Sequence, residues 1–263
     1  MDIRHENGIA LMVAMMAMLL MTALGAALVL TTSSEAIVAA NFRNSGECLY
    51  AADAALERIL DELLTVPDWN PLLGGAAKSA FIDGAPGGGR TLADGTTIDL
   101  TRLLAMANCR KATLCSDGDM DLVTHDRPWG RNNPRWQLYG YGHLRDLLPT
   151  ASVNSPYYVV VMVGDDPSEL DEDPTRDGIT PCEGAVPVRG TGDPPAWSCN
   201  PGTGVIGLRA EAFGPGGAHK VIEMTVARTA AAPGQNSFAG NPPDYNIGGG
   251  QVGVRVVSWR EVR

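Results

Sequence analysis

The residues best suited to ligand binding lie in an acidic segment that follows an apolar run. Seven carboxylates crowd into residues 165–177: Asp165, Asp166, Glu169, Asp171, Glu172, Asp173 and Asp177. Such crowding repels itself unless the loop stays extended in water or binds a cation, and oxygen-only ligands favour calcium. The sequence leaves both interpretations open, a solvated acidic loop and a calcium site. The candidate calcium ligands are Asp165, Asp166, Asp171, Asp173 and Asp177.

A second acidic group has the alternate spacing of a calcium-binding loop, at Asp117, Asp119 and Asp121. An EF-hand loop needs glycine at its sixth position and a bidentate acid at its twelfth. These positions are Leu122 and Pro128 here, so the EF-hand form is excluded.

Catalytic motifs are missing from the sequence. It contains no Gly-x-Ser-x-Gly elbow and no His-Glu-x-x-His motif. The glycines at residues 140–142 lead to Arg145 where a Rossmann fingerprint needs another glycine, and His125, His143 and His219 are isolated from one another. We therefore expect a protein that is not an enzyme.

The cysteines indicate an oxidising compartment. Cys109 and Cys115 are close in sequence, Cys182 and Cys199 enclose a loop rich in proline and glycine, and Cys48 stands alone. No pair has the short spacing of a zinc site, so two local disulfides with Cys48 free are the preferred pairing. The sequence does not fix the connectivity.

The rest of the chain is organised around an apolar run. Residues 9–30 carry no charge, and about 20 apolar residues at about 1.5 Å each span the hydrocarbon core of a bilayer. The run is longer than the apolar part of an ordinary secretory signal peptide. It is also followed by further helical sequence, so we expect a transmembrane helix at residues 9–30.

The helical pattern continues without proline from Glu35 to Leu64, until Pro67 ends it. Apolar residues in this continuation recur at three-and-four spacing, which predicts one buried face on an amphipathic helix over residues 31–66. The residues of this stripe are Leu49, Ala52, Leu56, Ile59, Leu60 and Leu63.

This amino-terminal region resembles the PilX-like minor pilins of type IV pili. The resemblance rests on a short polar leader ending in Gly8, the apolar run from Ile9, and residues 39–44 (Ala-Ala-Asn-Phe-Arg-Asn) and 50–56 (Tyr-Ala-Ala-Asp-Ala-Ala-Leu). It implies that prepilin peptidase removes residues 1–8 after Gly8 and methylates the new amino terminus at Ile9. It also implies an inner-membrane protein with a periplasmic head that later enters a pilus or pseudopilus and assembles with major and minor pilins.

Val13 departs from the general pilin pattern, in which the fifth residue after the leader is Glu. A carboxylate in lipid costs about 2.5–3.5 kcal/mol and needs a partner, and Val13 avoids both the cost and the contact. PilX-like pilins and the K-type minor pseudopilin of type II secretion are similar in lacking this Glu. By that analogy we expect a position near a filament tip.

After the helix, residues 67–263 are predicted to form a head with an antiparallel sheet. A β-branched and aromatic run at residues 157–163 predicts a central buried strand. Residues 205–213 and 219–227 alternate around a Gly-Pro-Gly-Gly turn and predict a hairpin, and a last strand with a bulge near Val257 is expected from residue 252. The sheet must bury an apolar face, and the helical stripe is the available partner, so the fold class is α+β and pilin-like.

Composition narrows the function further. The net charge of −10 argues against nucleic acid binding, because an acidic surface repels phosphates. We expect a minor pilin that acts in filament assembly or priming and presents its head loops to other pilins or a tip adhesin. A type II secretion pseudopilin and a membrane-anchored periplasmic binding domain outside any filament are the alternatives.

Overall fold

The computed structural model describes residues 6–66, 68–148, 154–169, 172–177, 204–229 and 253–262. The chain divides into two compact units, Met1–Gly46 and Glu47–Arg263, and helix α1 runs from one into the other. We call the described part of the first unit the stalk and that of the second unit the head.

Helix α1 spans Glu6–Leu63. This confirms that the apolar run and its amphipathic continuation are both helical, and the two form one continuous helix. It has no proline between its ends. Among the described residues, it is the one helix that is long and apolar enough to cross a membrane. The stalk contains only this helix.

The head is built on a five-stranded antiparallel sheet in the order β3-β4-β5-β6-β7. Its strands are β3 (Gln137–His143), β4 (Tyr158–Asp165), β5 (Val205–Gly214), β6 (Ala218–Thr229) and β7 (Gly253–Val262). Every residue of β4 is buried, as predicted for a central strand. The predicted hairpin is β5–β6, with Leu208 opposite Met224.

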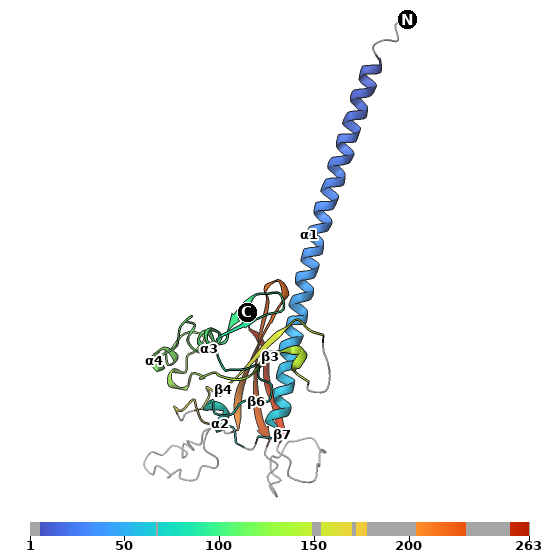
Figure 1. Ribbon diagram of the computed structural model, residues 1–263. Helices are drawn as coiled ribbons and strands as arrows, with labels where there is room; N and C mark the ends of the chain where they lie inside the picture. Colours follow the sequence, from blue (N-terminus) through green and yellow to red (C-terminus); the bar gives the residue numbers. More distant parts are fainter. Residues whose placement is uncertain are drawn as a thin grey trace, which may run out of the picture. The chain divides into compact units, whose positions relative to one another are not determined.

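The residues 47–63 of α1 form a layer on one face of this sheet (Figure 1). The core between them joins the predicted helical stripe to inward side chains of the strands, among them Val161, Leu208 and Ile222. Full burial of one such side chain contributes about 1.5–3 kcal/mol, so this interface is the main source of stability in the head.

A second, smaller layer covers the β3–β4 part of the opposite face. It contains α3 (Leu100–Cys109) and the two-stranded hairpin of β1 (Gly89–Thr91) and β2 (Thr97–Asp99). Asp99 caps α3, because its side chain accepts a hydrogen bond from the backbone N–H of Arg102 at 3.0 Å. The sequence did not predict the β1–β2 hairpin, because both strands have only three residues and no apolar alternation.

Short elements complete the head. These are α2 (Asn70–Leu73), α4 (Asp117–Met120) and the 3-10 turns η1 (Gly130–Asn132), η2 (Leu144–Asp146) and η3 (Pro215–Gly217). Ser116 is the N-cap of α4 and forms a capping box with Asp119.

The two edges of the sheet differ. At β3 the segment of residues 79–83 forms backbone hydrogen bonds with Tyr139 and Tyr141, so this edge is covered. β7 lies at the other edge and carries the predicted bulge, since pairing moves from Ser258 to Val256 and leaves Val257 without an opposite residue. Val256 and Trp259 are about half exposed there.

Candidate assembly surface

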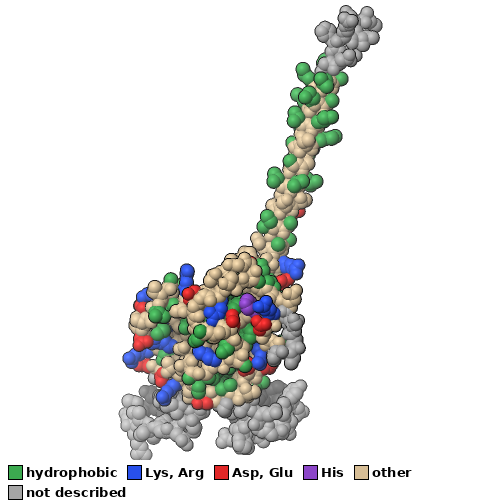
Figure 2. Space-filling view, in the orientation of Figure 1, with side chains coloured by type: hydrophobic (Ala, Val, Ile, Leu, Met, Phe, Trp, Pro, Cys, Tyr) green, Lys and Arg blue, Asp and Glu red, His purple; other side chains and the backbone are tan. Residues whose placement is uncertain are grey.

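The stalk presents apolar side chains on all sides. Residues 9–43 of α1 are exposed throughout, and Figure 2 shows these apolar side chains along the helix. Fourteen large apolar side chains are exposed between Ile9 and Leu30, and Ile37, Val38 and Phe42 continue the series. An apolar surface of this length must be covered by lipid or by other proteins.

Four hydroxyl side chains of the stalk are compatible with apolar surroundings. Thr22, Thr31, Thr32 and Ser34 each donate a hydrogen bond to a backbone carbonyl three or four residues earlier, at 2.8–3.0 Å. A hydroxyl that is satisfied within its own helix avoids the cost of an unpaired polar group in lipid or in a helical bundle.

The expected processing site lies at the start of α1. The helix begins at Glu6, so Gly8 and Ile9 are both within its first turns. Cleavage between them stays a prediction. Val13, five residues after Gly8, is an exposed apolar residue among others, and no carboxylate stands at that level of the helix.

In the head, the same helix is buried on one face. Cys48, Ala52, Leu56, Ile59 and Leu63 are all fully buried against the sheet. Four of them belong to the predicted stripe. The sequence signal that identified the stripe was its spacing, because the residue types alone do not differ from those of the stalk.

Cys48 is a free and buried cysteine. Its Sγ lies 3.1 Å from the carbonyl oxygen of Ala212, to which the thiol donates. Burial raises the pKa of Cys48 to about 11, although Lys220 acts in the opposite direction. The thiol is therefore protonated at neutral pH and serves as a small packing group.

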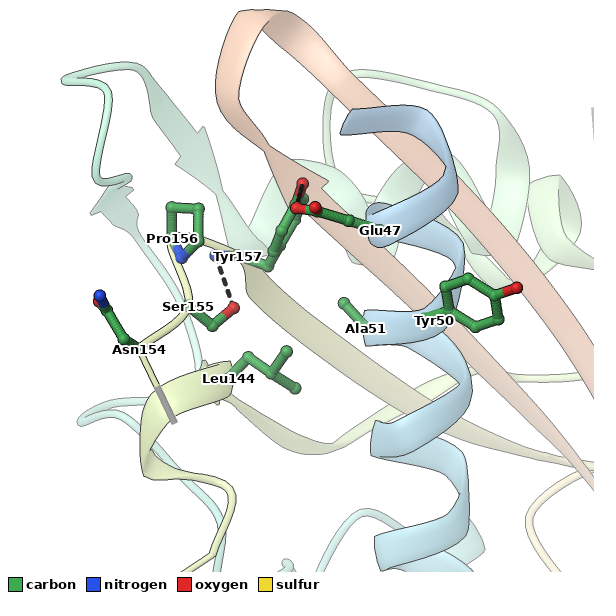
Figure 3. A pocket seen from close by; sticks show the side chains of 8 residues that line it. All are labelled: Glu47, Tyr50, Ala51, Leu144, Asn154, Ser155, Pro156 and Tyr157. Atoms are coloured by element: carbon green, nitrogen blue, oxygen red, sulfur yellow. Dashed lines mark hydrogen bonds between the residues drawn. The ribbon is translucent and has the colours of Figure 1, made fainter. Parts of the chain in front are cut away.

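A groove of about 240 Å³ lies beside this part of the helix. It is lined by Glu47, Tyr50, Ala51, Leu144, Asn154, Ser155, Pro156 and Tyr157. Figure 3 shows the Tyr157 ring reaching toward Glu47. The Tyr157 hydroxyl donates a hydrogen bond to Glu47 Oε2 at 3.0 Å. The Tyr50 ring points away from Pro156. Gly214 makes room for Tyr157, since a Cβ at residue 214 would lie 2.2 Å from Cε1 of the ring. Sequence reasoning missed this groove, because it joins residues about a hundred positions apart.

Ion pairs cross the strands on the face of the sheet opposite α1. Arg209 contacts Glu211 at 2.9 Å and Glu223 at 2.7 Å, Arg260 also bonds to Glu223, and His219 lies 3.0 Å from Glu211. Burial alone would raise the pKa of Glu211, but the hydrogen bond with His219 and the charge of Arg209 outweigh it and hold the pKa below its usual value. The alternation of residues 205–213 predicted a strand but not these partners across the sheet.

Three of the candidate calcium ligands accept hydrogen bonds from other residues of the chain. Asp166 accepts from Ser168 Oγ at 2.6 Å, Asp173 from Thr175 Oγ1 at 2.6 Å, and Asp177 from the N–H of Gly204 at 2.6 Å. Burial raises the pKa of Asp177. Asp165 ends β4 and is buried, and Asp171 lies outside the described residues.

Within the described part of the chain, no three His, Cys, Asp or Glu side chains group as metal ligands would. Calcium binding by the acidic segment stays a prediction.

The other acidic group is bound by cations of its own chain. Arg135 bridges Asp117 and Asp121 at 3.1 and 2.6 Å, and Lys111 contacts Asp119 at 2.6 Å. Hydrogen bonds from Lys111 and from residue 116 lower the pKa of Asp119 to about 2. These carboxylates therefore have a structural role between α3 and α4.

One of the two expected disulfide pairings lies within the described residues. Cys109 and Cys115 are bonded, with their Cα atoms 6.0 Å apart, and the bridge links the end of α3 to the loop before α4. Cys182 and Cys199 lie outside the described residues.

The long apolar helix and the antiparallel sheet packed on its second half define a pilin-like α+β protein. Residues 7–57 match the PilX N-terminal family, which is a type IV pilin-like family of minor pilins. Pilins are structural proteins that assemble with other pilins. No curated protein and no solved structure matches the chain. The family match ends at residue 57, before the strands of the sheet.

Proposed function

We propose that the protein is a minor pilin that enters a type IV filament through its stalk and acts at or near the tip in assembly or priming. The observation that carries this proposal is the exposed apolar surface of residues 9–42, which lies within the PilX N-terminal match. A helix of this length extends about 51 Å, whereas the hydrocarbon core of a bilayer is about 30 Å thick. Lipid therefore covers only part of the surface, and neighbouring helices in a filament would cover all of it.

Assembly would exchange one apolar environment for another. Before assembly the stalk lies in the inner membrane with the head in the periplasm, and prepilin peptidase cleaves the leader after Gly8. The helix then leaves lipid for a bundle of pilin helices, where close packing adds dispersion contacts. The four hydroxyls that donate to carbonyls of their own helix keep these hydrogen bonds in both environments.

Two features support a position near the tip. Val13 lacks the carboxylate through which other pilins contact a neighbouring amino terminus. The head also carries loops and an apolar groove beside Tyr157 that a further minor pilin or a tip adhesin could contact. The type II secretion pseudopilus remains the alternative filament, because the missing Glu is compatible with it as well.

The test is the mass and amino-terminal sequence of the protein from native envelope and sheared-filament fractions. A chain that begins at methylated Ile9 and is present in filaments is the expected result. A chain that still begins at Met1 and remains in the membrane would overturn the proposal in favour of an anchored periplasmic domain.

Calcium binding is proposed separately for the acidic segment. Calcium added to the native protein should raise the thermal unfolding midpoint of the head, whereas magnesium at equal concentration should not. Equal midpoints in both salts would leave a solvated acidic loop.

A further inference from the structure

Glu35 is the one charged residue in the sequence between Ile9 and Phe42. It is exposed, and the residues one helical turn away on its own helix are Thr31, Thr32, Val38 and Ala39, none of which is a cation. The nearest cation along the helix is Arg43, eight residues and about 12 Å further on. Its own helix therefore does not neutralise Glu35.

The position of Glu35 on the helix is not arbitrary. Glu35 belongs to a series with one residue at every seventh position: Met21, Leu28, Glu35 and Phe42. Leu24 lies three residues after Met21, and Val38 lies three residues after Glu35. In a coiled coil these are the two sets of positions that face a partner helix. All five apolar residues are exposed in the stalk.

The same heptad spacing continues into the head. Leu49, Leu56 and Leu63 follow at seven-residue intervals, with Ala52 and Ile59 in the second set. There the stripe packs against the sheet, and four of these five residues are fully buried. In the head the partner surface belongs to the same chain, whereas the stalk part of the stripe needs a partner from another chain.

The cost of Glu35 differs between the membrane and the filament. It stands about 39 Å along the helix from Ile9, beyond the approximately 30 Å hydrocarbon core, so its charge remains hydrated before assembly. When another helix covers Leu28, Val38 and Phe42, it covers Glu35 as well. A carboxylate in such a seam destabilises the interface unless it is paired.

We propose that Glu35 forms an ion pair with a cationic group on a neighbouring pilin helix and thereby selects that neighbour and its register. A single polar residue in an apolar seam has this effect in coiled coils, because mismatched partners leave it buried and unpaired. The proposal rests on the proposed function, since it requires entry into a filament.

The test compares three substitutions in the full-length protein, produced in cells that assemble the filament. Glu35→Leu and Glu35→Gln remove the charge from the seam. Glu57→Gln is the matched control, because Glu57 is exposed on the same helix but lies outside the stripe. The readout is the amount of protein in sheared filaments relative to the membrane, with cleavage of the leader measured in parallel.

Both Glu35 variants should lower the filament-to-membrane ratio by about tenfold or more, because each leaves the cation of the neighbour buried and unpaired. Leader cleavage and Glu57→Gln should match the wild type. A filament-to-membrane ratio for Glu35→Leu equal to or above that of the wild type would overturn the proposal. If Glu35 were unpaired in the filament, its replacement by leucine would stabilise the interface. Absence of the wild-type chain from filaments would instead overturn the proposed function, and this proposal with it.

A zero-length carbodiimide cross-link in intact filaments identifies the cation. The reagent joins a carboxylate to a nearby amine, so a link from Glu35 to a lysine or to an amino terminus distinguishes these two sources by mass spectrometry. Loss of incorporation without any link assigns the cation to an arginine guanidinium, which this reagent does not couple.

Discussion

The two parts of helix α1 use the same residue types to opposite effect. In the stalk, Leu20 and Leu28 are exposed, whereas in the head Leu56 and Leu63 have no exposed surface. The difference lies in what surrounds them. Apolar residues occur on every side of the stalk helix, but in the head they form one stripe flanked by charged residues such as Glu57 and Asp61. An apolar helix surface thus specifies intermolecular contact when it is continuous around the helix, and packing within the chain when it is a stripe.

The largest effect is expected where this stripe meets the sheet. Leu56→Ala should lower the free energy of unfolding of the head by about 2–5 kcal/mol, because it leaves a cavity in a fully packed core. Leu20→Ala should leave it unchanged, since Leu20 is exposed in the stalk. All five tryptophans follow residue 66 in the sequence. Tryptophan fluorescence during urea unfolding in detergent micelles therefore reports on the head. Equal effects of the two substitutions would contradict the comparison.

The contrast between stripe and continuous apolar surface was readable from the sequence. Spacing predicted the buried positions of Ala52, Leu56, Ile59 and Leu63, and the β-branched run predicted the buried strand β4. These features are local repeats, and burial acts on them directly.

Contacts between distant segments could not be predicted in the same way. The pair of Tyr157 with Glu47 depends on the space left by Gly214, and the ion pairs of Glu223 depend on the register of three strands. The sequence gives each side chain an outward or inward position. It does not say which residue lies opposite, because register is decided by the whole sheet.

The next largest effect is expected at Glu211, a buried carboxylate of the head. Glu211 is paired within its own chain, whereas Glu35 in the stalk has no cation within one turn of its own helix. Glu211→Gln should lower the free energy of unfolding by about 1.5–3 kcal/mol at pH 7, since it removes charged hydrogen bonds to Arg209 and His219.

The pH dependence of this effect has a defined sign. The pKa of Glu211 is lower in the folded head than its ordinary value of 4.5, so its stabilising contribution is present above that value and is lost as the pH falls through the folded pKa. The difference in stability between wild type and Glu211→Gln should therefore shrink below about pH 4.5. Unfolding curves at several pH values measure it, and a constant difference from pH 7 to pH 3 would contradict the assignment.

Thiol reactivity compares the two parts of α1 without perturbing the core. Cys48 is buried with a pKa of about 11, and Ala40, eight residues earlier, is exposed. N-ethylmaleimide reacts with exposed thiolates. At neutral pH it should therefore modify Cys48 at least about a hundredfold more slowly than a cysteine introduced by Ala40→Cys. Peptide mass spectrometry follows each site separately. Urea should abolish the difference, whereas fast labelling of native Cys48 would show that this part of α1 leaves the sheet.

The smallest expected effect lies at the boundary between stalk and head. Gly46 is the last residue of the first compact unit, it is helical, and a Cβ there would meet no atom within 4 Å. Gly46→Ala should stabilise the helix locally by up to about 1 kcal/mol, because glycine is a poor helix former. Hydrogen exchange of the amides around residue 46, followed by mass spectrometry in micelles, should slow by up to about fivefold.

Gly25 provides the matched control, since a Cβ there also meets no atom within 4 Å. It lies within the apolar run, where lipid or detergent excludes water and an opened backbone hydrogen bond has no replacement. Exchange at Gly25 should already be slow, and Gly25→Ala should change it little. Equal slowing at both glycines would mean that the surroundings of the two regions do not differ. Slowing at residue 46 alone would show that helix propensity matters only where the apolar environment of the stalk gives way to water.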